Sequence, residues 1–465
     1  MKLSVSAVVD EFRGAQLGDV RRNTRLSWIA KQFAMQPGES IPKMAGDEVG
    51  LEAVYRFLGN PGISWLDVLA PHTRRTRERS GVSSEVFVLH DTTTFQFNHG
   101  DPDEIGWLPT GKPGFLGHVS LVVSADGERR PLGIAHLEPI FREARSKRPR
   151  AQKQSGNEST QREDREALRW NRGVLASTAL LAPVTQCIHI MDREGDSFAL
   201  LADISSYCAR FVVRMRHNRV ARSLDEGSPW SKVRPLLEKP EATLEREVPL
   251  AKRVAKTAPR SKQPARDARL ATLHMAATSI EIKSPNYLND TPALAVNVVR
   301  VFEPSPPVDQ EPIEWLLMTT EPVSTPAEIA RVVDAYRTRW VIEEFFKALK
   351  SGCVYEERRL ESRTGLLNAL ALFVPIACEM LWMRSRARNA PTAPASEVLS
   401  ARQITILRAM LRKPLPEEPS ARDVLLAIAG LGGHLKRNGE PGWSTIRHGY
   451  ERLLTAEIGW VARSQ

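Results

Sequence analysis

Two aspartates and one glutamate of this chain occur where their carboxylates could share a metal ion. Asp91 follows the apolar run Glu85–His90, and Asp192 follows a second apolar run, Cys187–Met191. Glu343 lies in a segment with helical periodicity. If the two runs are neighbouring strands and the helix packs across them, the carboxylates form an all-oxygen site suited to Mg²⁺ or Mn²⁺. Two such ions could activate an attacking hydroxyl and stabilise the leaving oxygen of a phosphodiester.

The segment from residue 326 to 350 predicts one continuous amphipathic helix. At about 100° per residue, four of its polar side chains share a face opposite the apolar one. These residues are Tyr336, Arg339, Glu343 and Lys350. A surface helix with incidental polar residues would show the same pattern. Because Tyr, Arg and Lys offer Mg²⁺ no ligand, this face is more naturally a phosphate clamp, in which Arg339 can bind bidentately.

Each of these carboxylates also has an ordinary structural explanation. An aspartate after a strand is often a turn or helix-capping residue, and Asp196 fits the N-cap of a helix expected over residues 196–207. A pair of acids could also flank a sugar in a glycosidase without any metal. Two aspartates after strands together with a helical glutamate favour the metal site.

Residues 1–80 predict a module of short helices. We expect helices over Ser4–Phe12, Asp19–Ala34 and Asp47–Leu58, with Asp19 as an N-cap. Basic side chains gather in this module, and they either form a solvated surface or contact DNA phosphates. They are Arg21, Arg22, Arg25 and Lys31 near one helix, and Arg74, Arg75, Arg77 and Arg79 in a later run.

Strand periodicity begins near residue 84 and predicts an α/β core. Three strands should form an antiparallel meander, followed by a helix, a fourth strand and a second helix. The expected ranges are 85–90, 118–124 and 129–136 for the meander, then 165–181, 187–191 and 196–207. Residues 209–320 predict a β-rich insertion. Two basic stretches, Arg142–Arg165 and Lys252–Arg269, are predicted to be loops, and helices return after Glu361.

Composition limits the class of protein further. The chain has 465 residues, which suggests two to four domains. Its 65 Lys and Arg against 55 Asp and Glu give a net charge of +10, which favours a polyanionic partner, although a basic enzyme without nucleic acid would share it. The four cysteines lack C-x-x-C spacing, so we expect free thiols. No signal or membrane segment is apparent, which predicts a cytoplasmic protein.

These motifs resemble those of DDE-type bacterial insertion-sequence transposases of the IS-four family, which includes the Tn-five transposase. The most specific motif is the Tyr-x2-Arg-x3-Glu-x6-Lys box that runs from Tyr336 to Lys350. Supporting motifs are His90-Asp91-Thr92-Thr93, Met191-Asp192-Arg193-Glu194, and Leu17-Gly18-Asp19 followed by Arg21-Arg22. The resemblance extends over nearly the whole chain.

The resemblance implies an α/β fold with a ribonuclease-H-like core, similar to that of retroviral integrases, over residues 81–365. A β insertion would interrupt the core at about residues 209–320. Helical domains would flank it: residues 1–80 would recognise transposon ends through residues such as Arg21, Arg22 and Arg25, and residues 366–465 would dimerise. The implied partners are double-stranded transposon-end and target DNA and a second copy of the chain, with no membrane, in the bacterial nucleoid.

The resemblance also implies the chemistry of cut-and-paste transposition. Asp91, Asp192 and Glu343 would be the catalytic and metal-binding residues, with two Mg²⁺ or Mn²⁺ ions. Nicking, hairpin formation, hairpin opening and strand transfer would follow one another. Trp315 lies 21 residues before Tyr336, where the family carries a base-holding tryptophan, although a core tryptophan on a strand is the alternative. A non-catalytic DNA-binding or inhibitory relative and a nuclease that never joins strands are the other candidate functions.

Overall fold

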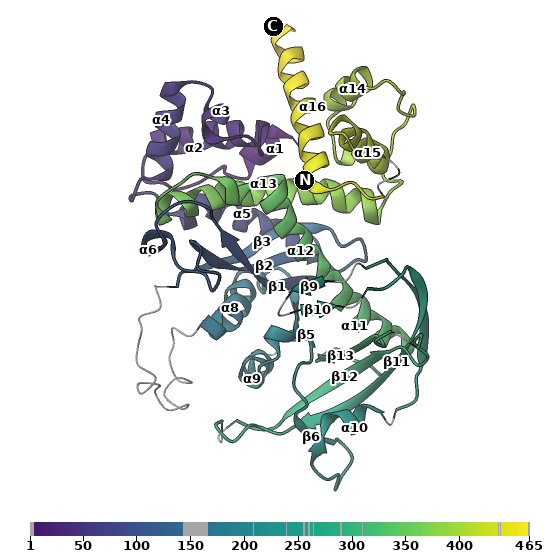
Figure 1. Ribbon diagram of the computed structural model, residues 1–465. Coiled ribbons are helices and arrows are strands. Elements are labelled where there is room, and N and C mark those ends of the chain that lie inside the picture. The colour runs from purple at the N-terminus through teal and green to yellow at the C-terminus, as the bar shows by residue number, and fades with distance from the viewer. Residues whose placement is uncertain are drawn as a thin grey trace. The chain divides into compact units, whose positions relative to one another are not determined.

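The chain folds into two compact units in the computed structural model (Figure 1). Unit 1 comprises Met1–Gln186 and Trp340–Gln465, and unit 2 comprises Cys187–Arg339. The structure describes residues 4–463 except 143–165, 208, 239, 254–255, 259–260, 264, 289–290, 309, 436 and 438. Apart from Arg142, the first expected basic loop therefore lies outside the described residues, as does Cys208.

The N-terminal part of unit 1 is helical, as expected. The three predicted helices are confirmed, and Asp19 is the N-cap of the second, with its Oδ1 accepting the Arg21 N–H at 2.7 Å. Two further helices were not predicted, and the second contains the Arg74–Arg79 run. Its buried face includes His72, Thr76 and Ser80, which obscures the apolar period. The helices are α1 (Val5–Asp10), α2 (Val20–Met35), α3 (Ile41–Ala45), α4 (Glu48–Leu58) and α5 (Trp65–Ser80).

The predicted antiparallel meander is also present in unit 1. Strands β1 (Glu85–Gln96), β2 (Gly114–Ser124) and β3 (Pro131–Ile140) pair in the order β3-β2-β1. A short helix, α6 (Pro102–Ile105), lies between β1 and β2. After the turn η2 (Glu166–Leu168), helix α8 (Arg169–Leu181) covers one face of the meander, while α5 packs at β3 (Figure 1).

The second part of unit 1 is built around one long helix, α13 (Arg363–Asn389). Among the described residues it is the one helix long and apolar enough to cross a membrane, but 94% of its most apolar window is buried inside the protein. Its apolar character is therefore explained by packing in the core. The surrounding elements are α12 (Trp340–Lys347), the π-helical turn η4 (Ala348–Gly352), η5 (Tyr355–Glu357), η6 (Ala395–Glu397), α14 (Ala401–Met410), α15 (Ala421–Leu431) and α16 (Trp443–Arg463).

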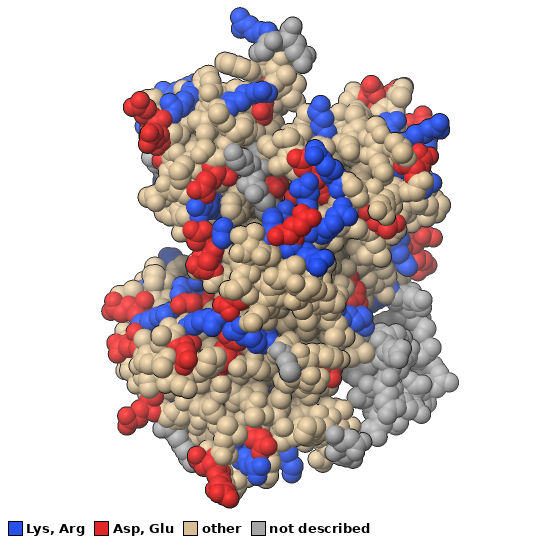
Figure 2. Space-filling view, turned by 180° about the vertical axis from the view of Figure 1, so that it is seen from behind, with Lys and Arg blue, Asp and Glu red and all other residues tan. Residues whose placement is uncertain are grey.

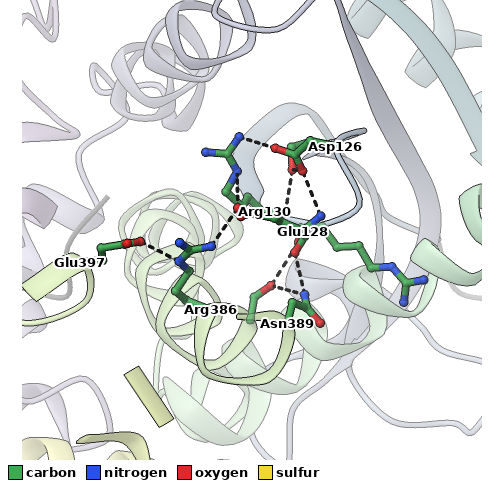
Figure 3. A network of polar contacts seen from close by, with 9 residues as sticks. Asp126, Glu128, Arg130, Arg386, Asn389 and Glu397 are labelled. Atoms are coloured by element: carbon green, nitrogen blue, oxygen red, sulfur yellow. Dashed lines mark hydrogen bonds and ion pairs between the residues drawn. The ribbon is translucent and has the colours of Figure 1, made fainter. Parts of the chain in front are cut away.

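Polar contacts attach the C-terminal end of α13 to the turn between β2 and β3 (Figure 3). Arg386 donates through Nη1 to Glu128 at 2.8 Å and through Nε to Glu397 at 2.7 Å. Asn389 Nδ2 donates to the backbone carbonyl of Glu128 at 2.8 Å. Asp126 and Arg130 form an ion pair within the same turn. The last turns of α13 are thus held on two sides.

Unit 2 is dominated by a mixed sheet in the order β4-β5-β13-β12-β11-β6-β7, with β8 also paired to β11. Strands β4 and β5 are parallel, and the other pairs are antiparallel. The strands expected across residues 209–320 are thus present. The strands are β4 (Gln186–Met191), β5 (Arg210–Arg214), β6 (Val220–Ser223), β7 (Ser231–Lys232), β8 (Leu244–Leu250), β11 (Arg269–Ile282), β12 (Leu294–Phe302) and β13 (Glu314–Thr319). The helical elements are η3 (Arg193–Gly195), α9 (Phe198–Ser206), α10 (Val233–Glu238) and α11 (Pro326–Thr338).

The second basic stretch, Lys252–Arg269, is not simply a loop. Strands β9 (Lys256–Ala258) and β10 (Ser261–Gln263) pair in antiparallel register. The backbones of Arg253 and Arg266 form an isolated antiparallel β-bridge. Backbone pairing of this kind does not require an apolar alternation, because the ladder is formed by main-chain groups. Hydrophobic periodicity therefore could not reveal it.

Candidate active site

Asp91 lies within β1 and does not end it, so the expectation that it terminates a strand was wrong. The ladder with β2 continues from the Asp91–Val119 pair to the Gln96–Gly114 pair. Phe95 is buried beyond it, which keeps the strand in the core. Asp91 is half-buried, and its Oδ1 accepts the N–H of Thr92 at 2.8 Å. The carboxylate therefore occupies the position where β1 changes from fully buried residues to partly exposed ones.

A polar network supports β1 directly beside Asp91. Arg169 Nε donates to Thr92 Oγ1 at 2.8 Å, and that hydroxyl lies 3.0 Å from His118 Nδ1. Burial, with smaller contributions from His136 and Arg169, lowers the pKa of His118 to about 3. His118 is therefore neutral, and its Nδ1 shares one hydrogen bond with the Thr92 hydroxyl, which also accepts from Arg169. This network holds the Thr92 backbone that contacts the Asp91 carboxylate.

Helix α8 approaches this network closely because residue 173 is glycine. A Cβ atom at Gly173 would lie 2.7 Å from His118 Nε2 and 3.3 Å from His90 Nδ1. The first distance is below any ordinary carbon contact, so a larger residue would displace the helix or the histidines. Gly173 thus allows α8 to bring Arg169 to Thr92.

Glu343 and Lys350 belong to unit 1, whereas Tyr336 and Arg339 belong to unit 2. The single helix predicted for residues 326–350 was wrong: α11 ends at Thr338, α12 begins at Trp340, and a π-helical turn follows from Ala348. Arg339 keeps right-handed helical dihedral angles (φ −50°, ψ −32°), but the π-helical turn departs from 3.6 residues per turn, so the wheel no longer places Lys350 with the other three motif residues. Glu343 itself is half-buried on α12, which packs against β1.

Lys350 has partners within unit 1. Its Nζ donates to the carbonyl of Thr94 at 2.5 Å and lies 3.5 Å from Glu356 Oε1. Glu356 Oε1 also accepts the N–H of Gln96 at 2.8 Å. The lysine of the motif therefore ties the turn after α12 to the part of β1 that follows Asp91.

Asp192 directly follows β4, as predicted. It is half-buried, and its Oδ1 accepts the N–H of Glu194 at 2.8 Å at the start of η3. The proposed N-cap role of Asp196 was wrong, because Ser197 precedes α9. Asp196 is instead buried, accepts the N–H groups of Arg216 and His217 at 2.6 and 3.0 Å, and pairs with Arg219. A buried carboxylate that needs partners overrides a local capping preference.

Trp315 lies in a cluster of aromatic and cationic side chains in unit 2. Its ring meets that of Tyr336 edge-on, with centroids 5.6 Å apart, and the Arg214 guanidinium lies 5.8 Å from the Trp315 centroid. Burial lowers the pKa of Arg214, while a side-chain hydrogen bond with Tyr336 opposes that shift. Arg339 adds a further positive charge near Arg214. The structure thus places three of the motif-associated residues, Trp315, Tyr336 and Arg339, around Arg214.

Sequence reasoning missed Arg214 and the basic cavity near it. Arg214 ends the apolar strand β5, and a charge at that position in a buried strand was the available signal. A small cavity of about 170 Å³ lies in unit 2. Arg193, which follows Asp192, lines it together with Glu314 and Leu316, which flank Trp315 in the sequence. Its lining includes Arg193, Arg216, His217, Arg234 and Glu314.

The N-terminal arginines differ in their surroundings. Arg21 is exposed, and the guanidinium of Arg25 lies 5.3 Å from the Trp28 ring centroid. Arg22 instead donates through Nη1 to the carbonyls of Leu17 and Gly62 at 3.1 and 2.9 Å. Arg22 therefore already has a structural role at the start of α2. In the later basic run, Arg79 pairs with buried Glu11 at 2.7 Å.

Charged side chains of both signs are interspersed over the face shown in Figure 2. Ion pairs such as Arg172 with Glu138 and Arg422 with Glu440 neutralise many of the arginines. On the face shown in Figure 2, Lys and Arg are interspersed with Asp and Glu and do not form one large basic patch.

The carboxylates suit a hard divalent cation by their donor atoms, since Mg²⁺ and Mn²⁺ prefer carboxylate oxygens. Asp91 and Glu343 lie in unit 1 and Asp192 lies in unit 2. Within neither unit do the described residues bring three His, Cys, Asp or Glu side chains together as a metal-binding group. Cys187, Cys353 and Cys378 are free thiols, in agreement with the expectation from their spacing.

Two family models match the chain. Residues 4–63 match the family described as transposase DNA-binding, and residues 154–374 match the transposase DDE domain. The second range contains Asp192, Trp315 and Glu343, while Asp91 lies between the two matches. DDE transposase domains have a ribonuclease-H-like core and use divalent metal ions, and the first match makes DNA a partner. With a transposase DNA-binding domain at its N-terminal end and a DDE domain after it, this chain is a DDE transposase.

Proposed function

We propose that the protein is a cut-and-paste DNA transposase of the IS-four type, similar to the Tn-five transposase. The observation that carries the proposal is the match of residues 154–374 to the DDE domain, since this range contains Asp192 after β4 and Glu343 on α12. The Tyr336–Lys350 box narrows the resemblance to this family. Its core would be of the ribonuclease-H-like, integrase-like type, with the strands of residues 209–320 as the insertion.

We propose Asp91, Asp192 and Glu343 as the catalytic residues and as the ligands of two Mg²⁺ or Mn²⁺ ions. Bound metal would supply activation of the attacking hydroxyl and stabilisation of the leaving oxygen. The protein holds two of these carboxylates on packed elements: Asp91 on the central part of β1 and Glu343 on α12. Rigid elements of this kind are suited to hold ligands within a few tenths of an ångström.

The reaction would begin with hydrolysis of one strand at the transposon end. The freed 3′-hydroxyl would attack the opposite strand to give a hairpin, a second hydrolysis would open it, and the 3′ ends would then join target DNA. A hairpin bends the backbone so tightly that a base must leave the stack. Trp315 is suited to hold that base, because a half-exposed indole offers a stacking face and Tyr336 and Arg214 support it.

The remaining motif residues would hold the DNA backbone. We propose Arg339 as a phosphate contact near the Trp315 cluster and Lys350 as a contact that also orders the turn after α12. Arg21 and Arg25 are the stronger candidates for transposon-end contact in the N-terminal domain, since Arg22 has two backbone acceptors. Residues 366–465 would form the dimer of the synaptic complex on the transposon ends.

The test is cleavage of end-labelled DNA that carries the terminal inverted repeat, with Mg²⁺, with EDTA, and with the Asp192→Ala variant. The nicked, hairpin and joined products are resolved separately. Metal-dependent hairpin and joined products that the variant fails to form would support the proposal. Specific binding without cleavage would identify a non-catalytic DNA-binding relative, and cleavage without joining would identify a nuclease.

A further inference from the structure

Glu344, the residue next to Glu343 on α12, is held by side chains from three helices of unit 1. Its Oε1 accepts a hydrogen bond from Lys347 Nζ at 2.9 Å. Its Oε2 accepts one from Trp443 Nε1 at 3.2 Å and lies 3.4 Å from Arg384 Nη1. One carboxylate thus joins α12 to α13 and to the first residue of α16.

These contacts are shielded from solvent. The side chains of Glu344 and Arg384 are 19% and 9% exposed, and Trp443 is 5% exposed. The Arg384 guanidinium also lies over the Trp443 ring, 4.6 Å from its centroid. Arg388 adds a second positive charge 3.8 Å from Glu344 Oε2. Because the group is mostly buried, these attractions are stronger than those of surface ion pairs. We call Glu344, Arg384 and Trp443 the Glu344 clamp.

Helix α12 depends on such contacts for its orientation. It has 8 residues, follows the break at Arg339, and runs into the π-helical turn η4. A helix this short is marginal without tertiary contacts. Burial of its apolar face, with Phe345 and Phe346, stabilises the helix. The hydrophobic effect is not directional, so this burial alone does not fix the rotation of the helix about its axis. The Glu344 clamp, in contrast, fixes which side of α12 faces Arg384 and Trp443.

Consecutive residues of a helix are about 100° apart, so the two glutamates move together. A rotation of α12 that loosened Glu344 would swing Glu343 through the same angle. The helix that supplies Arg384 is itself anchored, since Arg386 and Asn389 attach its last turns to the β2–β3 turn (Figure 3). The clamp therefore fixes the position of Glu343 relative to an anchored part of unit 1.

We propose that Glu344, Arg384 and Trp443 are positioning residues for the reaction: they hold α12 so that Glu343 is correctly presented, and they make this depend on α16. The inference rests on the proposed role of Glu343. The beginning of α16 is then part of the frame of the active site. Supporting residues of this kind typically change metal affinity or activity by about 10- to 100-fold.

The test compares Glu344→Gln, Trp443→Phe and the double variant in DNA cleavage. Glu344→Gln removes the charge, and Trp443→Phe removes the Nε1 donor while keeping a ring under Arg384. The measurements are the cleavage rate, the Mg²⁺ concentration that gives half the maximal rate, binding of transposon-end DNA, and the thermal unfolding midpoint. Glu397→Gln is the matched control, because it also removes a carboxylate partner of α13 but contacts Arg386 instead of α12.

We expect each single variant to slow cleavage about 10- to 100-fold and to raise the half-maximal Mg²⁺ concentration, with end binding unchanged. The double variant should be no slower than the slower single variant, since both changes disrupt the same Glu344 clamp. Normal rates and Mg²⁺ dependence, or losses that multiply, would overturn the inference. If Glu344→Gln does not fold, Trp443→Phe alone decides it. An active Glu343→Gln variant would instead overturn the proposed function, whatever the clamp variants do.

Discussion

Unit 1 and unit 2 contain different members of the proposed catalytic and DNA-binding residues. Unit 1 contains Asp91 and Glu343, on elements fixed by buried polar networks. Unit 2 contains Asp192 together with the aromatic and cationic cluster around Trp315. The residues proposed as metal ligands are therefore divided between the units, while the proposed base-holding group belongs to unit 2 alone. Chemistry and strand holding should be separable by mutation.

The largest effect should come from the carboxylates of either unit. We expect Asp91→Asn and Asp192→Asn each to reduce cleavage by far more than about 100-fold, because each removes a proposed metal ligand and not a supporting residue. Single-turnover cleavage and transposon-end binding are measured in parallel, and binding should be retained. Activity in Asp91→Asn but not in Asp192→Asn would remove Asp91, which lies outside both family matches, from the site.

A large loss of stability should follow from breaking the buried network of unit 1. Glu11 is 4% exposed and accepts from Arg79 at 2.7 Å and from His72 at 2.5 Å, which together outweigh burial and lower its pKa to about 2. We expect Glu11→Ala to cost about 3–5 kcal/mol of unfolding free energy, since it leaves the partly buried Arg79 guanidinium without its carboxylate and the buried His72 Nδ1 without its partner.

Denaturant unfolding measures this loss, and hydrogen exchange assigns it to unit 1. Glu52→Ala is the control, because the Glu52–Arg56 pair is exposed and should contribute less than about 1 kcal/mol. Similar losses in the two variants would show that the Glu11 network does not set the stability of unit 1.

In unit 2, Trp315→Ala should impair hairpin formation while first-strand nicking remains largely intact. Stacking of one base on an aromatic ring contributes about 1–3 kcal/mol. Trp315→Phe should recover part of the lost rate because it keeps a stacking face. Rates of nicking and hairpin formation are measured on the same labelled end. An equal loss of both steps would refute the base-holding role.

Arg339→Ala should weaken binding of transposon-end DNA without changing the Mg²⁺ dependence of cleavage. Loss of one phosphate contact lowers the slope of log affinity against log salt by about 0.9. The measurement is end binding across a salt series, with Arg337→Ala as control, since Arg337 is a neighbouring arginine that pairs with Asp334. A changed Mg²⁺ dependence with unchanged salt slope would contradict the phosphate role of Arg339.

The last comparison concerns acid stability, where one buried histidine of each unit should behave alike. Burial lowers the pKa of His118 in unit 1 and of His189 in unit 2 to about 3. Between about pH 6.5 and 3 the unfolded chain binds a proton that each folded histidine does not. Stability is therefore fully present above pH 6.5 and falls as pH decreases, by up to about 1.4 kcal/mol per pH unit for each histidine.

Unfolding free energies measured from pH 7 to 5 test this. His118→Asn should reduce the slope of the unfolding free energy against pH. An unchanged slope in His118→Asn would mean that His118 takes up its proton in the folded state.

Several elements could be predicted from local sequence because local interactions specify them. Asp19 and Asp47 cap helices through their own backbone neighbours, and the apolar alternation of the meander marks its strands. The spacing of Tyr336, Arg339, Glu343 and Lys350 identified the transposase motif, and the family matches confirmed the class. These features depend on residues that are close together in the chain.

Other features depend on contacts between distant segments, and only the tertiary structure decided them. Asp91 lies inside β1 because β2 continues the ladder past it, and Asp196 is a buried anchor because Arg219 and the 216–217 backbone surround it. The division of the Tyr336–Lys350 box at Arg339 and the contact of Glu344 with Trp443 likewise have no local signature. Periodicity reports which face a residue occupies in a regular element, whereas the partner that satisfies a buried charge is determined by packing.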